Sequence, residues 1–266
     1  MRFSPFTNLD ISILDELRPP DWTDTKIPFQ FYLTTEFCFP IKLLYNDQIV
    51  GVGCTIMHED VAWIAHIIVH PDFRKQGFGT AITMKLIEQA KEKNADTIYL
   101  IATDLGSPVY SKLGFITETE YLFYKEVSLK IEYIATDKII PSEGKYFDDL
   151  CDLDKTLSTE NRIGHLLNHC NAGYLYLENK KLTGFYLPSF GDGLILAQNP
   201  SAGIALLQLH FTKSDKVFFP QENLNAFQFM KSNYFDPYRK AKRMRLGKKR
   251  NWSAESIYNR IGGNLG

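Results

Sequence analysis

Short apolar segments with the spacing of β-strands alternate with helical patterns along the first half of the chain, and this alternation limits the fold more than any other feature. Residues 39–58 (FPIKLLYNDQIVGVGCTIMH) predict a hairpin with Asn46-Asp47 as its turn. Residues 61–71 (VAWIAHIIVHP) are mostly apolar, as expected for a strand covered on both faces, and Pro71 ends it. The segment 80–94 predicts a helix, with apolar side chains at helical spacing at Ile82, Leu86, Ile87 and Ala90.

A strand, a short helix and a strand complete the first half, at residues 97–103, 107–113 and 115–126. The order β-β-β-α-β-α-β predicts an α/β fold with mixed strand pairing. The second half has the same rhythm: it predicts a hairpin, a strand, a helix, a strand and a helix that runs into a strand, at 173–189, 192–197, 199–211, 216–220 and 222–235.

Two segments support a duplication. Residues 98–115 and 217–235 both show a strand, a polar turn, an amphipathic helix and a final phenylalanine. The stretch 127–171 is rich in charge and in helix-forming residues, and we interpret it as the junction. We therefore expect an N-terminal domain at 1–127 and a C-terminal domain at 128–266.

Composition and charge exclude several classes of protein. With 266 residues, 44% of them hydrophobic, the chain can bury a sizeable core, and its net charge of −1 gives no general attraction to nucleic acid or to an anionic membrane. No apolar run reaches the ~18 residues of a membrane span, and the first residues lack the apolar core of a secretion signal. The four cysteines lack C-x-x-C spacing, so we expect reduced thiols, no metal and a cytoplasmic location.

The most informative segment is 67–81 (IIVHPDFRKQGFGTA), in which a strand ends at a proline and a basic, glycine-rich loop opens a long helix. The N–H groups and the dipole of a helix's first turn bind anions. Gly77 and Gly79 let the backbone approach a phosphate closely, and the pair 74–75 adds positive charge. The segment therefore predicts a pyrophosphate site. It is neither a P-loop, whose G-x-x-x-x-G-K-[ST] is absent, nor a dinucleotide fingerprint, because Ile82 occupies the third glycine position.

The motif Arg74-x-x-Gly77-x-Gly79 resembles the [QR]-x-x-G-x-[GA] signature of the GNAT superfamily of N-acetyltransferases. The preceding V-x-P-x-x-R at 69–74 resembles the family's usual lead-in. Downstream, Y-x-K-x-G-F at 110–115 resembles a further family segment. Together these motifs cover about residues 43–126.

The second half resembles the C-terminal domain of a bacterial GNAT subfamily with two such halves, through its Gly-containing hairpin, its strand ending in Pro220 and R-M-x-x-G at 243–247. Where the first half has RKQGFG, the second has NPSAGI (199–204), without the arginine and the G-x-G pair. The resemblance implies tandem GNAT-like folds, each a mixed, mostly antiparallel sheet flanked by helices, with a splayed parallel strand pair in the N-terminal half. It also implies a degenerate C-terminal half that closes over the acceptor pocket.

For the mechanism, the resemblance implies that an amine attacks the thioester of acetyl-CoA directly in the cleft between strands 61–71 and 97–103. A backbone N–H near Val69 would polarise the carbonyl oxygen. Tyr110 would be catalytic, by protonating or hydrogen-bonding the departing thiolate. The implied cofactor-binding residues are Ile67, Ile68 and Val69 for the pantetheine arm, Arg74, Lys75, Gln76, Gly77, Phe78, Gly79 and Thr80 for the pyrophosphate, and Tyr110.

The base that takes the proton of the amine stays open in the sequence. Candidates are Glu36, His58, Glu59 and His66, beside a water-relayed path. Strict strand alternation would place His66 on the face opposite Ile67 and Val69. The aromatic-rich segment 22–39 is our prediction for contact with a small-molecule or peptide amine acceptor, although core packing is the commoner use of such residues.

Two other readings remain. A CoA-binding GNAT-fold sensor or scaffold without turnover is the alternative to the enzyme, because no base is obvious. The basic stretch 238–250 (YRKAKRMRLGKKR) could bind nucleic acid, an acidic acceptor or the CoA 3′-phosphate. We interpret it as a surface loop and strand with solvated charge, because no aromatic residues alternate with the basic ones. The sequence leaves the oligomeric state open.

Overall fold

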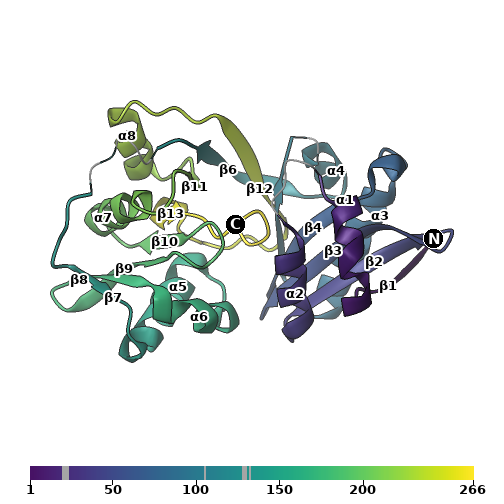
Figure 1. Ribbon diagram of the computed structural model, residues 1–266, viewed down its shortest axis with the longest axis horizontal. Coiled ribbons are helices and arrows are strands. Elements are labelled where there is room, and N and C mark those ends of the chain that lie inside the picture. Colours follow the sequence, from purple (N-terminus) through teal and green to yellow (C-terminus); the bar gives the residue numbers. More distant parts are fainter. Residues whose placement is uncertain (20–23, 105, 128–130, 132) are drawn as a thin grey trace. The chain divides into compact units, whose positions relative to one another are not determined.

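The computed structural model describes residues 1–19, 24–104, 106–127, 131 and 133–266. The chain forms two compact units, and neither is one continuous segment (Figure 1). The first unit consists of Met1–Leu100, Leu105–Ile116 and Met244–Lys248, and the second of Ile101–Asp104, Thr117–Arg243 and Lys249–Gly266. The domain boundary predicted after residue 127 stays a prediction.

The first four strands of the chain pair with one another in order, and every pair is antiparallel. In chain order the elements are β1 (Arg2–Pro5), a 3₁₀ helix (Asn8–Ile13), α1 (Leu14–Leu17), α2 (Lys26–Thr34), β2 (Cys38–Tyr45), β3 (Gln48–His58), β4 (Val61–Val69), a 3₁₀ turn (Pro71–Phe73), α3 (Phe78–Glu92), β5 (Thr97–Ala102) and α4 (Ser107–Lys112). The sheet order is β1-β2-β3-β4-β5, and the pairs from β1 to β4 are antiparallel. The hairpin predicted at Asn46-Asp47 is confirmed, and both residues have the positive φ of a tight hairpin turn.

The parallel pair β4–β5 separates soon after it begins. Its register joins Val61 to Thr97, Ala62 to Ile98 and Trp63 to Tyr99, whereas β4 continues to Val69. Because paired strands lie about 4.8 Å apart, strands that leave the register leave room between them. The predicted parallel pair that splays apart is therefore present in the N-terminal half.

Helix α3 packs closely on β3 because two glycines face it. A Cβ at Gly51 would lie 2.6 Å from Cδ1 of Ile82, and one at Gly53 would lie 2.8 Å from Cδ1 of Leu86. The predicted apolar face of this helix is buried at Ile82, Leu86, Ile87 and Ala90. This contact fixes the start of α3 relative to the end of β4.

The second unit is built around a five-stranded sheet. The elements that follow α4 are β6 (Ile116–Tyr124), β7 (Ile139–Pro141), a 3₁₀ turn (Gly144–Tyr146), α5 (Phe147–Ser158), α6 (Ile163–His169), a 3₁₀ turn (Cys170–Ala172), β8 (Tyr174–Glu178), β9 (Lys181–Leu187), β10 (Leu194–Ala197), α7 (Pro200–Phe211), β11 (Val217–Pro220), α8 (Leu224–Ser232), β12 (Arg239–Gly247), a 3₁₀ turn (Ala254–Ser256) and β13 (Ile257–Asn259). The sheet order is β13-β10-β9-β8-β7, with antiparallel pairs, and β11 pairs with β6. Helix α7 packs its Leu206 and Leu207 into the core of this unit, and Asn199 caps the helix as predicted.

The stretch 127–171, interpreted as a junction, contains folded elements in its described part. Helix α5 is amphipathic and buries Leu150, Leu153 and Leu157. It also buries Asp154, whose carboxylate pairs with the buried guanidinium of Arg162 at 2.5 Å. The helix-forming residues of this stretch do form helices, and its role as a junction stays a prediction. Residues 128–130 and 132 lie outside the described part of the chain.

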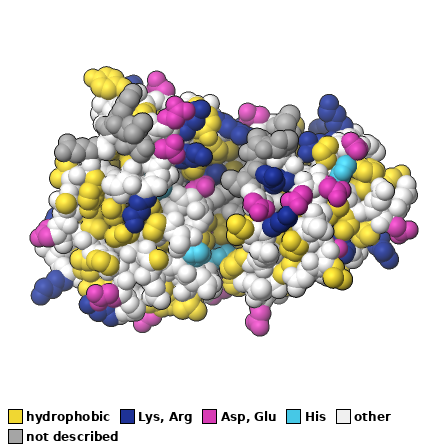
Figure 2. Space-filling view, viewed as in Figure 1, with side chains coloured by type: hydrophobic (Ala, Val, Ile, Leu, Met, Phe, Trp, Pro, Cys, Tyr) yellow, Lys and Arg dark blue, Asp and Glu magenta, His cyan; other side chains and the backbone are white. Residues whose placement is uncertain are grey.

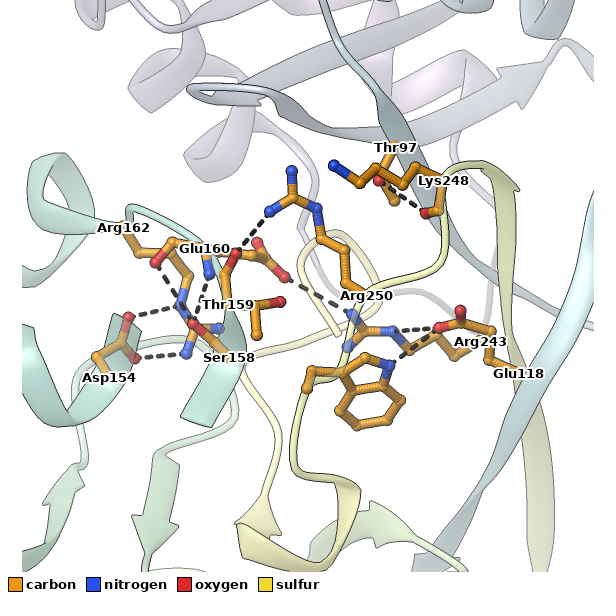
Figure 3. Close-up of polar contacts among 11 residues, drawn as sticks. Thr97, Glu118, Asp154, Ser158, Thr159, Glu160, Arg162, Arg243, Lys248 and Arg250 are labelled. Carbon is orange, nitrogen blue, oxygen red and sulfur yellow. Dashed lines mark hydrogen bonds and ion pairs between the residues drawn. The ribbon is translucent and has the colours of Figure 1, made fainter. Parts of the chain in front are cut away.

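The basic stretch 238–250 is only partly solvated, which corrects the interpretation from the sequence. Arg243 is 3% exposed on β12, where its guanidinium lies 3.9 Å from the ring centre of Trp252. It lies 3.8 Å from Glu118 and 3.7 Å from Glu160 (Figure 3). Nε1 of Trp252 donates a hydrogen bond to Glu118 at 3.0 Å. Acidic partners distant in the sequence therefore neutralise this arginine inside the second unit.

Candidate active site

The loop between β4 and α3 has the backbone of an anion site. Lys75 and Gly77 both have positive φ, 61° and 87°, and Gly77 precedes the first residue of the helix. The N–H of Ala81 donates to the carbonyl of Gly77 at 3.0 Å. The amides from Gly77 to Thr80 precede that bond and therefore have no acceptor within the helix. With the helix dipole, this first turn attracts an anion.

Open space lies beside both glycines of the motif. A Cβ at Gly77 would meet no atom within 4 Å, and one at Gly79 would meet only Cγ2 of Val69, at 3.8 Å. Packing inside the protein therefore does not require glycine at position 79, and the left-handed φ requires it at position 77. The residues present fit a diphosphate that lies against the backbone of this turn.

Side chains of the loop hold its own backbone. Nε of Arg74 donates to the carbonyl of Val69 at 3.1 Å, and Nε2 of Gln76 donates to the carbonyl of Asp72 at 3.1 Å. The side chains of Arg74, Lys75 and Gln76 are exposed. Arg74 therefore ties the loop to the end of β4 and adds positive charge at the same place.

An aromatic cluster anchors the loop from beneath, and the sequence reasoning missed it. The ring of Phe78 lies 5.2 Å from that of Tyr45 and 6.0 Å from that of Phe73, and Phe73 also contacts His70 at 5.7 Å. Phe78 is buried, so its predicted contact with a cofactor is limited to its backbone N–H. The sequence signal that could have predicted this cluster is the pair Phe73 and Phe78, which flank the turn.

Tyr110 lies on α4, next to α3. Its side chain is half-buried, its ring is 6.1 Å from Phe115, and among the described residues its hydroxyl has no hydrogen-bond partner. Burial disfavours the phenolate and raises the pKa of Tyr110 to about 12. At neutral pH this phenol is a proton donor.

The candidates for the base lie at different places in the first unit. Glu36 is exposed between α2 and β2, and Glu59 is exposed in the turn that begins β4. His58 is buried at the end of β3. His66 lies on β4 directly before Ile67, and only this candidate adjoins the predicted cofactor segment.

Strict alternation along β4 fails at His66. The register pairs Val52 with Ile68 and Cys54 with Ala65, so β4 has one residue more than β3 over this interval. The extra residue of β4 forms a β-bulge, and His66, within it, has a φ of 49°. The prediction that His66 faces opposite to Ile67 and Val69 therefore rests on a regular strand that is absent here.

The structure also bears on the predicted acceptor segment, on metal binding and on membrane spans. In the segment 22–39, Phe29 and Tyr32 are buried in the core, and Trp22 lies outside the described residues. Among the described residues, no three His, Cys, Asp or Glu side chains are placed to hold a metal ion. No helix in the described part has the length and apolarity of a membrane span. Basic and acidic side chains adjoin one another on the face in Figure 2.

Comparison with known proteins decides the family. Residues 7–115 match the model of the acetyltransferase (GNAT) family. This segment is a GNAT domain. Within it lie β4, the anion-binding turn, α3 and Tyr110, so the motifs that suggested the family and the geometry described above coincide.

Curated relatives match the GNAT domain over part of their length. A stretch of 77 residues, 28% of this chain, is 35% identical to the [ribosomal protein bS18]-alanine N-acetyltransferase of Haemophilus influenzae and covers 53% of that protein. Another of 86 residues, 32% of this chain, is 31% identical to the cysteine-rich protein 2-binding protein of Mus musculus and covers 11% of it. The chain thus spans about half and about a tenth of these relatives.

Solved structures share the fold beyond the GNAT domain. A candidate acetyltransferase from Pyrococcus horikoshii is 22% identical, with a TM-score of 0.84 over 100% of this chain and 95% of that one. A tandem GNAT protein from the clavulanic acid biosynthesis pathway is 11% identical, with a TM-score of 0.59 over 94% of this chain and 99% of that one. At these identities the likeness shows the fold alone, and it confirms the predicted α/β class.

Proposed function

We propose that this chain is an N-acetyltransferase that moves the acetyl group of acetyl-CoA to a primary amine by direct attack in a ternary complex. The observation that carries the proposal is the exposed start of α3, where the amides of Gly77 to Thr80 precede the helical bonds and two glycines face open space. A diphosphate ester has the charge and the shape that such a turn recognises. The GNAT family of residues 7–115 supports acyl transfer.

The chain's residues divide the work as follows. The turn from Arg74 to Thr80 holds the pyrophosphate, and the backbone of Ile67 to Val69 holds the pantetheine arm alongside β4, where β5 has moved away. A backbone N–H near Val69 polarises the thioester carbonyl. Tyr110 hydrogen-bonds the departing thiolate through its hydroxyl, which the raised pKa keeps protonated at neutral pH. The nitrogen–carbon bond forms as the carbon–sulfur bond breaks, and the proton that the nitrogen loses passes through water to the thiolate or to solvent.

The acceptor is a small-molecule or peptide amine. The name of the Haemophilus influenzae relative gives an alanine of ribosomal protein bS18 as its substrate. A peptide with an amino-terminal alanine therefore belongs in the first panel, with free amino acids and polyamines. We also propose a cytoplasmic location, since the four cysteines are free thiols.

Two measurements on the full chain test the proposal. Calorimetry with CoA measures binding, and a thiol-release assay with acetyl-CoA and the amine panel measures transfer. We expect micromolar CoA binding and thiol release that requires an amine. Binding without release on any amine would favour the CoA sensor, and absence of binding would overturn the loop assignment.

The variant Gly79→Asp locates the bound CoA. It places bulk and negative charge against the predicted phosphates, so CoA affinity should fall at least a hundredfold. Gly144→Asp is the matched control, because a Cβ there meets no atom within 4 Å, one at Gly79 meets only Val69 at 3.8 Å, and Gly144 lies in the second unit. Equal affinity in both variants, with both folded by circular dichroism, would remove the phosphates from the α3 turn.

A further inference from the structure

His66 has a backbone conformation that histidine rarely adopts. Its φ of 49° is in the left-handed region, which costs a residue with a Cβ about 1 kcal/mol or more. It lies within the β-bulge of β4, where one residue of β3, Gly53, opposes two residues of β4, His66 and Ile67. A strained residue of this kind persists only where its surroundings hold it.

The bulge occupies a particular place on β4. It comes three residues after Trp63, the last residue of β4 in register with β5, and directly before Ile67 to Val69. A bulge turns the strand and changes the direction of the backbone groups that follow it. The conformation of His66 therefore sets the direction of the N–H and C=O groups proposed to hold the pantetheine arm.

Helix α2 supplies the contact that holds this residue. The hydroxyl of Tyr32 is hydrogen-bonded to Nδ1 of His66 at 2.9 Å, and the ring of Phe29 lies 5.8 Å from the imidazole. Phe29 and Tyr32 are 0% and 2% exposed, so the imidazole meets a fixed part of the core. Lys42, distant in the sequence, ties the 3₁₀ helix before α1 to β2 through Asp10, which stabilises the same side of the unit.

We propose that the Tyr32–His66 pair is a positioning device that holds the bulge of β4, and with it the backbone of Ile67 to Val69, in the geometry that binds acetyl-CoA. The proposal rests on the proposed function for the identity of the ligand. The pair takes no proton from the substrate. Burial lowers the pKa of His66 to about 4, so its imidazole is neutral at physiological pH and is a weak acceptor for the proton of an amine.

The test compares two identical substitutions in two Tyr–His pairs. Tyr32→Phe removes the hydroxyl that contacts His66. Tyr186→Phe is its matched control, because the Tyr186 hydroxyl lies 3.1 Å from Nδ1 of His210 in the second unit and Tyr186 is also 2% exposed. Both variants lose one buried hydrogen bond of the same kind, so similar losses of thermal stability are expected.

The first measurement is amide hydrogen exchange of the full chain without ligand. Tyr32→Phe should speed exchange at Ile67 to Val69 at least fivefold, and Tyr186→Phe should leave it unchanged. The second is calorimetry with CoA, in which Tyr32→Phe should weaken binding about fivefold. That factor corresponds to the free energy of the single hydrogen bond that holds His66 in place. His66→Asn, which tolerates positive φ, should behave like Tyr32→Phe, and the double variant should be no weaker than His66→Asn alone.

The outcomes separate this inference from the proposed function. Faster exchange at Ile67 to Val69 in Tyr32→Phe alone supports the positioning device, whether or not CoA is the ligand. Equal exchange in both tyrosine variants overturns it. Unchanged CoA affinity with a lower kcat also overturns it, because the pair would then act on the chemical step. If the wild-type chain does not bind CoA, the proposed function is contradicted. Hydrogen exchange at Ile67 to Val69 then still tests whether the Tyr32–His66 pair holds the bulge.

Discussion

At the scale of single residues, the site depends on groups whose surroundings set their protonation. Tyr110 is half-buried on α4, and the cost of burying a phenolate keeps its proton in place far above neutral pH. His66 is half-buried too, and there the same cost removes the charge, because its charged form is the protonated one. Burial therefore keeps Tyr110 protonated, as a hydrogen-bond donor, and keeps His66 neutral.

Tyr110→Phe should lower kcat about 10- to 100-fold and change CoA affinity less than twofold, because only the departing thiolate uses the hydroxyl. With a pKa of about 12, the wild-type phenol remains protonated up to about pH 11. The rate should therefore show no decline near pH 10 from this group, measured as kcat against pH. Equal turnover of wild type and Tyr110→Phe would remove Tyr110 from the mechanism. Tyr234→Phe, at a 92% exposed position of the second unit, is the control.

At the scale of elements, the segment that leads from β4 through the loop into α3 contains two glycines with different physical tasks. Gly77 provides a left-handed φ of 87°, which the chain needs to turn into the helix. Gly79 lies in the first turn of α3, where a methyl group would fit beside Val69. Gly77 therefore serves the fold, and the open space beside Gly79 is where we propose that the diphosphate lies.

Alanine at the two positions should separate these tasks. Gly77→Ala should cost about 1 to 2 kcal/mol of stability through its positive φ. Gly79→Ala should be neutral or raise stability by up to about 1 kcal/mol, because alanine favours the helix. Gly77→Ala should also weaken CoA binding, because it disturbs the turn that presents the amides. Gly79→Ala should change CoA affinity less than twofold, because the signature that this motif resembles has glycine or alanine at that position. Chemical denaturation and calorimetry measure the two effects, and a loss of stability in Gly79→Ala as large as in Gly77→Ala would contradict the assignment of the two tasks.

The elements were predictable where hydrophobic periodicity and turn residues agree. The Asn46-Asp47 hairpin, the apolar face of α3 and the cap at Asn199 all follow from local patterns. The bulge at His66 was not predictable, since no local signal requires a positive φ at a histidine. The burial of Arg243 was missed as well, because Glu118 and Glu160 are distant in the sequence.

At the scale of the whole molecule, the two units exchange segments of chain. Residues Met244–Lys248, which are the end of β12 and the residue after it, belong to the first unit. Strand β12 is the neighbour of β5 in the sheet order. There the hydroxyl of Thr97 donates to the carbonyl of Lys248 at 2.8 Å, and the N–H of Lys248 donates to the carbonyl of Asp96 at 2.9 Å. A Cβ at Gly247 would lie 2.2 Å from that Asp96 carbonyl, so this close approach requires glycine.

A fragment of residues 1–127 should therefore be incomplete. Without the segment 244–248, the edge of β5 loses these hydrogen bonds, and the fragment should unfold at a lower temperature than the first unit of the full chain. Adding a peptide of residues 239–250 should raise its melting temperature, and a scrambled peptide should not. Equal melting temperatures of the fragment with and without the peptide would show that the segment contributes little.

The shared strand also orders events on the ribosome. The 127 residues of Thr117–Arg243 are made between the first unit's penultimate segment and its final one. At about 5 to 20 residues per second, translation of that interval takes roughly 6 to 25 s. Throughout this time the nascent polypeptide displays β5 without its last neighbour, so the first unit is complete only after most of the second unit has been made.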